Sequence, residues 1–392
     1  MSGPGPDGDE PEPKEVSAAD GPAAERAAEE LTAPAEGWPR WGLYVAGSLA
    51  FGAVGGFLFE WLTMPLAWMI GSMVFATAAA LMGAPVRGSK RIRSVMVPVL
   101  GIMLGSAFTP ETLSHVGRWV PSVISMLVFV AVVIAAVAFY LYRFMGFGPV
   151  SAYFSATPGG LATMAVIGTE MGGDDRRIGL THSIRIMLTV LIIPFYFRIF
   201  EGYVPGGLES LGRAADLSLR DGLILLACMG GYPLFKVLRL PSAQILGPMI
   251  LSAAVHATGI TTAKPPVEAV NLAQLVIGTG IGARFVGVSV VRLYRVMLAG
   301  AGATVFMVAF AAAAALALEA WTGLPFAAVW LAFAPGGVAE MTLISLALGI
   351  DIAFVSTHHV VRVVFMVIAA PLVFHWLRKR WGIREDPSRH GF

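Results

Sequence analysis

The sequence predicts an all-α polytopic membrane protein made of two inverted repeats, each with five transmembrane helices and one re-entrant helical hairpin. Three observations lead to this prediction. The chain is 56% hydrophobic and 13% charged, which is far from the composition of a soluble domain. The segment TPGGLATM, from Thr157, is echoed by APGGVAEM, from Ala334. Finally, the basic residues obey the positive-inside rule only if these two segments do not cross the bilayer.

Residues 1–40 predict a disordered acidic tail, because Pro, Gly, Ala and acidic residues dominate them and Lys14 and Arg26 are the only basic residues before Arg40. No basic segment followed by an apolar core precedes the first span, so we expect no signal peptide. Residues 378–392 predict a basic cytoplasmic tail. Elsewhere the basic residues are spread over the loops, so we expect no nucleic-acid partner.

Each predicted membrane repeat contains six apolar segments of roughly the length that a bilayer core requires. Repeat 1 covers residues 41–200 and repeat 2 covers residues 221–377, with a linker over 201–220. The segments lie near 42–61, 64–83, 94–109, 120–142, 151–171 and 178–200 in repeat 1, and near 221–239, 241–259, 267–287, 295–318, 324–349 and 354–377 in repeat 2.

The two repeats share a sequence pattern. When Pro158 is aligned with Pro335 without gaps, 12 of 37 positions are identical as far as Pro194 and Pro371. Upstream, GIMLG at 101–105 corresponds to GTGIG at 278–282, and this spacing of small residues predicts close helix packing. Repeats of this size with several spans are typical of secondary transporters.

The basic residues decide between two topologies. If all twelve segments crossed, the repeats would be parallel, and Arg176, Arg177, Lys236, Arg239, Arg284, Arg292 and Arg295 would lie outside. If the PGG segment of each repeat enters and leaves on one side, these residues lie in the cytoplasm and the repeats are inverted. We therefore expect ten crossings in the bacterial cytoplasmic membrane, with both termini cytoplasmic.

The PGG motifs predict the tips of two hairpins. Proline lacks an N–H and glycine allows the chain to reverse, so each segment divides into arms that reach about halfway across the bilayer. Unpaired backbone at that depth must lie in protein or water, and the helix start after the tip favours anions. These arguments predict a substrate site lined by Pro158, Gly159 and Gly160 and by Pro335, Gly336 and Gly337. The alternative is a proline kink in a spanning helix.

Charged residues recur at fixed distances after each tip. His182 and Arg185, like His359 and Arg362, are three residues apart and share a helix face. They are either structural anchors, or substrate ligands in which arginine binds a carboxylate or phosphate and histidine donates or carries protons.

Other polar residues around the tips have less regular partners. Glu340 occupies the position of Thr163 in the other repeat, and either caps its helix or serves as a proton or sodium site paired with Arg362 or His359. Asp174 and Asp351 are expected at helix starts. Asn271, Gln274, Arg284 and Gln244 occur in repeat 2 only and could make the cavity asymmetric.

At these motifs the sequence resembles the AbrB family of bacterial membrane proteins, in which each half carries a PGG-containing segment. The matching parts are TPGGLATM with Asp174, His182 and Arg185, and APGGVAEM with Asp351, His359 and Arg362. The resemblance covers roughly residues 42–377. Members of this family are also labelled as an ammonia monooxygenase or a regulator, and neither label supplies a chemistry for this chain.

We expect a secondary transporter that works by alternating access and carries a small anionic metabolite, a carboxylate, between Arg185 and Arg362. Protons or sodium would be the coupling ion, with no other cofactor, no metal and no catalytic residue. Its partners would be the substrate and the lipid bilayer, and a homodimer is left open. The alternatives are a membrane receptor or regulatory scaffold, and an enzyme resembling ammonia monooxygenase. An enzyme is disfavoured because, apart from His358 and His359, the histidines are scattered and no HExxH or GxSxG motif occurs.

Overall fold

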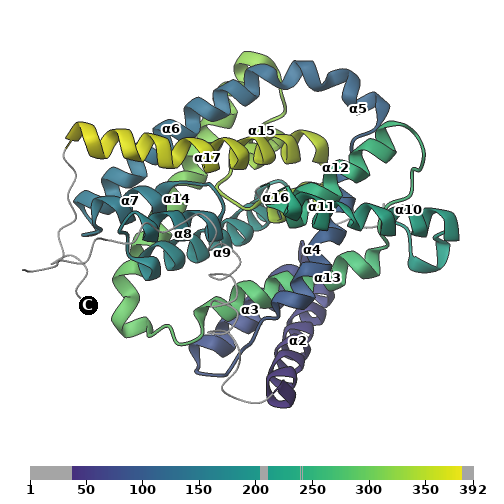
Figure 1. Ribbon diagram of the computed structural model, residues 1–392, viewed down its shortest axis with the longest axis horizontal. Coiled ribbons are helices and arrows are strands. Elements are labelled where there is room, and N and C mark those ends of the chain that lie inside the picture. Colours follow the sequence, from purple (N-terminus) through teal and green to yellow (C-terminus); the bar gives the residue numbers. More distant parts are fainter. Residues whose placement is uncertain (1–37, 204–210, 239, 241, 382–392) are drawn as a thin grey trace, which may run out of the picture. The chain divides into compact units, whose positions relative to one another are not determined.

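The computed structural model describes residues 38–203, 211–238, 240 and 242–381, and this part of the chain folds into helices without a β-strand (Figure 1). The predicted tail at 1–37, part of the linker at 204–210 and the basic end at 382–392 lie outside the described residues. Residues 38–40 and 378–381, assigned to the tails from sequence, belong to the first and last helices.

Five of the described helical segments are long and apolar enough to cross a bilayer. They contain α2 (Trp38–Trp61), α6 (Val120–Arg143), α9 (Asp175–Phe200), α14 (Val290–Thr322) and α17 (Ile352–Trp381). Each coincides with one of the ten predicted spans. The all-α class and the membrane-protein character of the chain therefore agree with the sequence.

The other five predicted spans correspond to shorter helices. These are α3 (Ala67–Leu81), α4 (Lys90–Gly105), α12 (Ala243–Ala257), α13 (Val267–Gly282), and the consecutive pair α10 (Leu219–Met229) and α11 (Gly231–Val237). Helices of 15 or 16 residues are about 24 Å long, which is less than the hydrocarbon core. Left-handed residues limit two of them, because α3 starts after Leu66 (φ 50°) and α12 after Ser242 (φ 52°).

Both PGG segments are interrupted helices. The first consists of α7 (Pro149–Ala156) and α8 (Leu161–Glu170), and the second of α15 (Phe326–Phe333) and α16 (Val338–Ala347). The chain leaves the helical path for four residues at each motif, so a continuous proline-kinked helix is wrong. All four helices begin and end at positions 177 residues apart, as do the starts of α9 and α17.

Helices from the two predicted repeats pack together. Helix α3 packs on α13, and α4 packs on α12. A methyl group added at Gly101 would lie 2.6 Å from the carbonyl oxygen of Ile245, and one at Gly278 would collide with the carbonyl of Met69. The predicted packing role of GIMLG and GTGIG is therefore confirmed.

The remaining elements connect these helices. They are α5 (Pro110–His115), η1 (Val116–Trp119), η3 (Ala214–Asp216) and η4 (Ala283–Phe285). Around the interrupted segments, α9 packs on α7, α8 and α14, while α17 packs on α15 and α16. Because α16 also contacts α9 and α8 contacts α17, the two interrupted segments share neighbours.

Candidate functional site

The first interruption runs from Thr157 to Gly160. The backbone N–H and the Oγ1 hydroxyl of Thr157 both donate to the carbonyl of Tyr153, at 3.1 and 2.8 Å, and so end α7. Gly160 has φ +89°, which side-chain-bearing residues rarely adopt. Helix α8 then begins without a side-chain cap on its first N–H groups. The start of α8 is thus an uncapped helix end, as the sequence predicts.

The second interruption, from Ala334 to Gly337, needs its glycine for a different reason. Gly337 has an ordinary φ of −79°, but a methyl group there would meet the carboxylate of Glu340, with Cδ at 3.0 Å. Glu340 is buried, and its side chain turns back over the start of α16. This placement agrees with the predicted helix-start role of Glu340.

A histidine–arginine pair binds the backbone at the start of the first interruption. Arg185 Nη1 donates to the carbonyls of Ser155 at 3.3 Å and Thr157 at 3.5 Å. Its Nη2 donates to Nδ1 of His182 at 2.7 Å, and Nε2 of His182 lies 2.9 Å from the carbonyl of Phe154. Both side chains, carried by α9, thereby hold the last turn of α7.

The second pair repeats this arrangement with shorter bonds. Arg362 Nη1 donates to the carbonyl of Ala334 and Nη2 to that of Gly336, both at 2.6 Å. Nη2 also lies 2.7 Å from Nδ1 of His359, whose Nε2 lies 2.8 Å from the carbonyl of Leu331. Here α17 anchors the last turn of α15.

These bonds fix the protonation pattern of both histidines. A guanidinium can only donate, so Nδ1 must accept, and a carbonyl can only accept, so Nε2 must carry the proton. A second proton would have to sit on Nδ1, directly against the arginine. The geometry therefore favours the structural-anchor alternative and gives His182 and His359 no capacity to carry protons while the anchor is intact.

A third arginine, Arg284 of η4, is half-buried, and its Nη1 has no hydrogen-bond partner among the described residues. The predicted pairing of Glu340 with Arg362 or His359 is not present, because the hydrogen bonds of Arg362 go to backbone carbonyls and His359. From the sequence, Arg284 was expected among the cytoplasmic loop cations and as a polar group that could make the cavity asymmetric, and Arg93 only among the cytoplasmic basic residues. Basic residues near helix ends look like topology signals, so no sequence feature distinguished them.

Several buried polar atoms have no hydrogen-bond partner within the described residues. They are Ser155 Oγ, Thr181 Oγ1, Arg185 Nε, Asn271 Oδ1, Gln274 Nε2 and Oε1, Thr279 Oγ1, Arg284 Nη1 and Arg362 Nε. An unpaired buried polar group is costly, so such atoms call for water or a ligand. Three of these atoms belong to the arginines at or near the interruptions. In the described part of the chain, no group of three or more His, Cys, Asp or Glu side chains could hold a metal ion.

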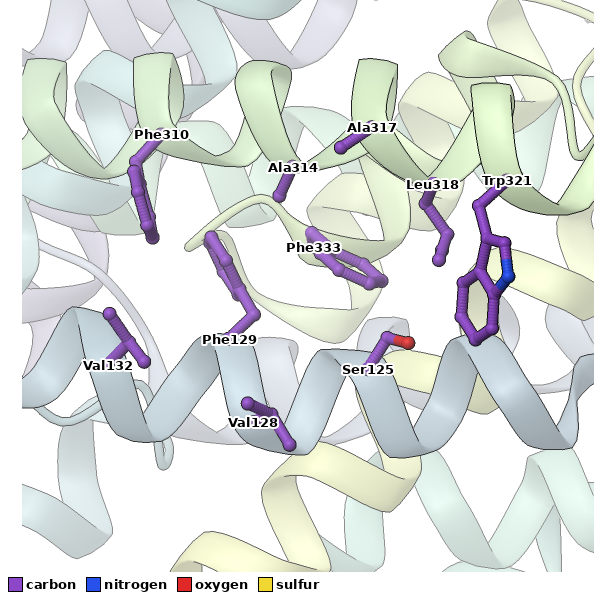
Figure 2. A pocket seen from close by; sticks show the side chains of 10 residues that line it. All are labelled: Ser125, Val128, Phe129, Val132, Phe310, Ala314, Ala317, Leu318, Trp321 and Phe333. Carbon is purple, nitrogen blue, oxygen red and sulfur yellow. The ribbon is translucent and has the colours of Figure 1, made fainter.

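An apolar pocket of about 300 Å³ lies beside the second interruption, between α6 and α14. Figure 2 shows Phe129 and Phe333 pointing into the space between these helices. Phe333 ends α15, one residue before the interruption. The lining is hydrocarbon apart from Ser125, the indole of Trp321 and the backbone, so this pocket offers no charged group to an anion.

Two smaller predictions near the site are confirmed. Asp174 Oδ1 accepts a hydrogen bond from the backbone of Arg177 at 3.1 Å, and Asp351 Oδ1 accepts one from Phe354 at 3.0 Å. Both aspartates therefore cap the starts of α9 and α17. Thr163, the counterpart of Glu340, lies half-buried in the first turn of α8.

The sequence is similar to one described protein family and to individual bacterial proteins. Residues 68–378 match the family described as transition state regulatory protein AbrB. A Bacillus subtilis (strain 168) protein named "Uncharacterized protein YhjN" is 28% identical over 361 residues, which cover 86% of this chain and 94% of that protein. An Escherichia coli (strain K12) protein named "Putative regulator AbrB" is 22% identical over 318 residues, covering 80% and 90%. Because the family match spans most of the sequence and includes both interrupted segments, this protein belongs to the AbrB family.

Proposed function

We propose that this protein is a secondary transporter, rather than an enzyme, and that it carries a small anionic metabolite, a carboxylate, across the bacterial cytoplasmic membrane. The observation that carries the proposal is the pair of interrupted apolar helices, each anchored by a buried arginine. In each pair the first helix ends where the arginine binds its last carbonyls. The second helix begins after a glycine, which has no side chain to cap the helix. Two such helix starts would form the anion site.

The anchors explain how such helix starts remain available. Arg185 and Arg362 donate to carbonyls at the ends of α7 and α15, where the helix dipole is negative. Their charges therefore compensate those ends and leave the start of α8 electropositive, while at the start of α16 the carboxylate of Glu340 covers Gly337. In this proposal the arginines position the site, while Pro158, Gly159, Gly160 and Thr163 line one side of it and Pro335, Gly336, Gly337 and Glu340 line the other.

The membrane arrangement that we propose has two inverted repeats and two re-entrant hairpins. The helices of the interrupted segments are 8 and 10 residues long, or about 12 and 15 Å, so each could reach the middle of the bilayer from one face. The constant offset of 177 residues supports a duplication, and the packing of α3 on α13 and α4 on α12 is what a twofold relation would produce. Alternating access with proton or sodium coupling fits this architecture.

Transport can be tested directly. Purified protein would be screened by thermal shift against a panel of carboxylates and phosphates, and uptake of each stabilising compound would be measured in proteoliposomes, with protein-free liposomes as the control. We expect accumulation of at least one anion that requires the protein and an ion gradient. If none of the tested anions stabilises the protein or enters the proteoliposomes, the proposal is contradicted.

A receptor or regulatory protein is the second candidate, because the matching family and the E. coli relative both carry a regulatory description. The same experiment separates the two. A receptor would bind an anion in the thermal-shift screen without moving it across the membrane, whereas a transporter would do both.

A further inference from the structure

The apolar pocket lies between α6 and α14, two helices that are each long and apolar enough to cross a bilayer. Its lining extends from Ser125 to Val132 on α6, or about 11 Å, and from Phe310 to Trp321 on α14, or about 17 Å. Figure 2 shows these side chains along the space between the two helices. Spanning helices are tilted by only about 20° on average from the bilayer normal, so the long direction of the pocket follows that of lipid acyl chains.

The pocket has an exposed rim and a buried floor. At the rim, Val128 is 61% exposed and Trp321 is 71% exposed. The floor consists of Phe129, Leu318 and Phe333, which are all buried. Because the rim belongs to membrane-spanning helices, the medium that reaches it in a bilayer is lipid. The floor is therefore open to lipid hydrocarbon from the side of the protein.

The lining favours hydrocarbon over water or an ion. None of the described residues that line the pocket is charged. The hydroxyl of Ser125 already donates to the carbonyl of Pro121 at 2.8 Å, and Trp321 lies at the exposed end. A water molecule needs several polar partners, which this lining does not offer. If the space were empty, its walls would lose dispersion contacts.

The size of the pocket separates a single chain from a protein segment. Helices α6 and α14 contact each other, and the axes of packed helices are about 8–10 Å apart. An α-helix with its side chains is about 10–12 Å in diameter, so a helix of a second copy cannot enter between them. A volume of about 300 Å³ matches the lower end of small-molecule sites, about 300–1,000 Å³. A hydrocarbon chain is narrow enough to reach the floor.

Aromatic rings connect the pocket with the second interruption. Phe310 stacks on Phe129 with 5.5 Å between ring centroids, and Phe129 lies 5.2 Å from Phe333. Phe333 ends α15 and precedes Ala334, whose carbonyl accepts a hydrogen bond from Arg362. Because protein interiors are closely packed, a molecule in the pocket bears on the end of α15.

We propose that the apolar pocket is a binding site for one acyl chain of a membrane phospholipid. The chain lies along α6 and α14, fills the space over Phe129 and Phe333, and supports the end of α15 from the lipid side. This site is separate from the proposed anion site. It does not depend on whether the protein transports an anion.

Photolabelling distinguishes a bound chain from the lipid that covers any membrane protein. Purified full-length protein in detergent micelles is titrated with phosphatidylglycerol that carries a diazirine on one acyl chain, and labelled residues are located by mass spectrometry after irradiation. We expect labelling within 125–132 and 310–321 to level off near one lipid per protein. Leu223 and Leu226 of α10 are similarly exposed, and their labelling should instead rise in proportion to the added lipid.

Two neighbouring alanines of α14 supply a matched pair of variants. Ala314 lines the pocket, so Ala314→Phe places a ring inside it and should lose most of the labelling there while Leu223 and Leu226 keep theirs. Ala313 is exposed and is not part of the lining, so Ala313→Phe should be labelled like the wild type. The wild-type titration needs no variant and remains decisive if Ala314→Phe does not fold.

Several outcomes would overturn the proposal. Pocket labelling that rises in proportion to the lipid would show an ordinary lipid-facing surface, and unchanged labelling in Ala314→Phe would place the bound chain elsewhere. If palmitate displaced the label more effectively than unlabelled phosphatidylglycerol, the occupant would be a free fatty acid. Absence of pocket labelling would also overturn the proposal, and a protein that sediments as a dimer would then assign the pocket to a second copy. None of these results bears on anion transport.

Discussion

A buried arginine normally has a carboxylate beside it, yet Arg185 and Arg362 are compensated by carbonyl oxygens at helix ends. Such ends carry partial negative charge, and two or three hydrogen bonds offset part of the cost of desolvating the guanidinium. The histidine beside each arginine accepts one further bond. Each histidine–arginine pair therefore connects a long helix to the end of a short one through hydrogen bonds.

Removing the hydrogen bonds of one of these arginines should destabilise the protein. Arg362→Ala leaves the carbonyls of Ala334 and Gly336 and Nδ1 of His359 without their donor, at a cost of about 1–3 kcal/mol for each group that stays buried and unpaired. We expect a clear fall in the melting temperature of the purified protein in detergent, with partial recovery in Arg362→Lys. Arg118→Ala, which changes an exposed arginine, is the control and should melt like the wild type. Equal melting of Arg362→Ala and the control would refute the anchoring role.

The sequence predicted the pairs but not their partners. Spacing of three residues places His182 and Arg185 on one face of a helix, which is correct, but it contains no information about what that face contacts. The contact is with the backbone of α7, and backbone carbonyls are present at every position, so no residue type marks them. The sequence also predicted that Arg185 and Arg362 contact the substrate directly. Their observed hydrogen bonds go to backbone carbonyls and histidines, so this contact stays a prediction.

Helices show a comparable division between what sequence could and could not predict. The interruptions were predictable because Pro-Gly-Gly disfavours a helix locally. The lengths of α3 and α12 were not, because apolar residues continue beyond the helix into turns that contain Gly83 and Gly259, both with positive φ. Hydropathy reports burial in an apolar environment and does not report where the backbone leaves the helix.

The glycines of α4 provide a test of helix packing. Gly101→Ala should destabilise the contact between α4 and α12, since the added methyl group would lie 2.6 Å from the carbonyl oxygen of Ile245 and 3.2 Å from Cβ of Pro248. Gly179→Ala in α9 is the matched control, because its methyl group would meet nothing within 4 Å. There we expect no loss of stability, and a gain of up to about 1 kcal/mol from helix propensity. Thermal melting of both variants would show the difference, and equal stability would contradict the packing argument.

The arrangement of the chain across the membrane that we propose is based on the placement of its basic residues, and single-cysteine labelling tests it. In a Cys228→Ala background, Arg176→Cys and Arg143→Cys should react with an impermeant maleimide only from the cytoplasmic side, and Arg213→Cys only from the opposite side. All three arginines are exposed in the structure. Arg176 decides between the two topologies, because twelve crossings would place it outside. Labelling of Arg176→Cys from outside would remove the basis for re-entrant hairpins.

The packing of α3 on α13 and of α4 on α12 has a consequence for biosynthesis. Helices α3 and α4 leave the ribosome long before residues 243–282, which form their main contact surfaces. Until then the surfaces that α3 and α4 later bury against α13 and α12, including Ala76 and Gly101, are covered by lipid, by earlier helices of the chain or by the insertion machinery. Folding of the amino-terminal part must therefore wait for translation of the carboxyl-terminal part, and a ribosome stalled near the linker would leave a nascent chain that is a natural target for membrane proteases.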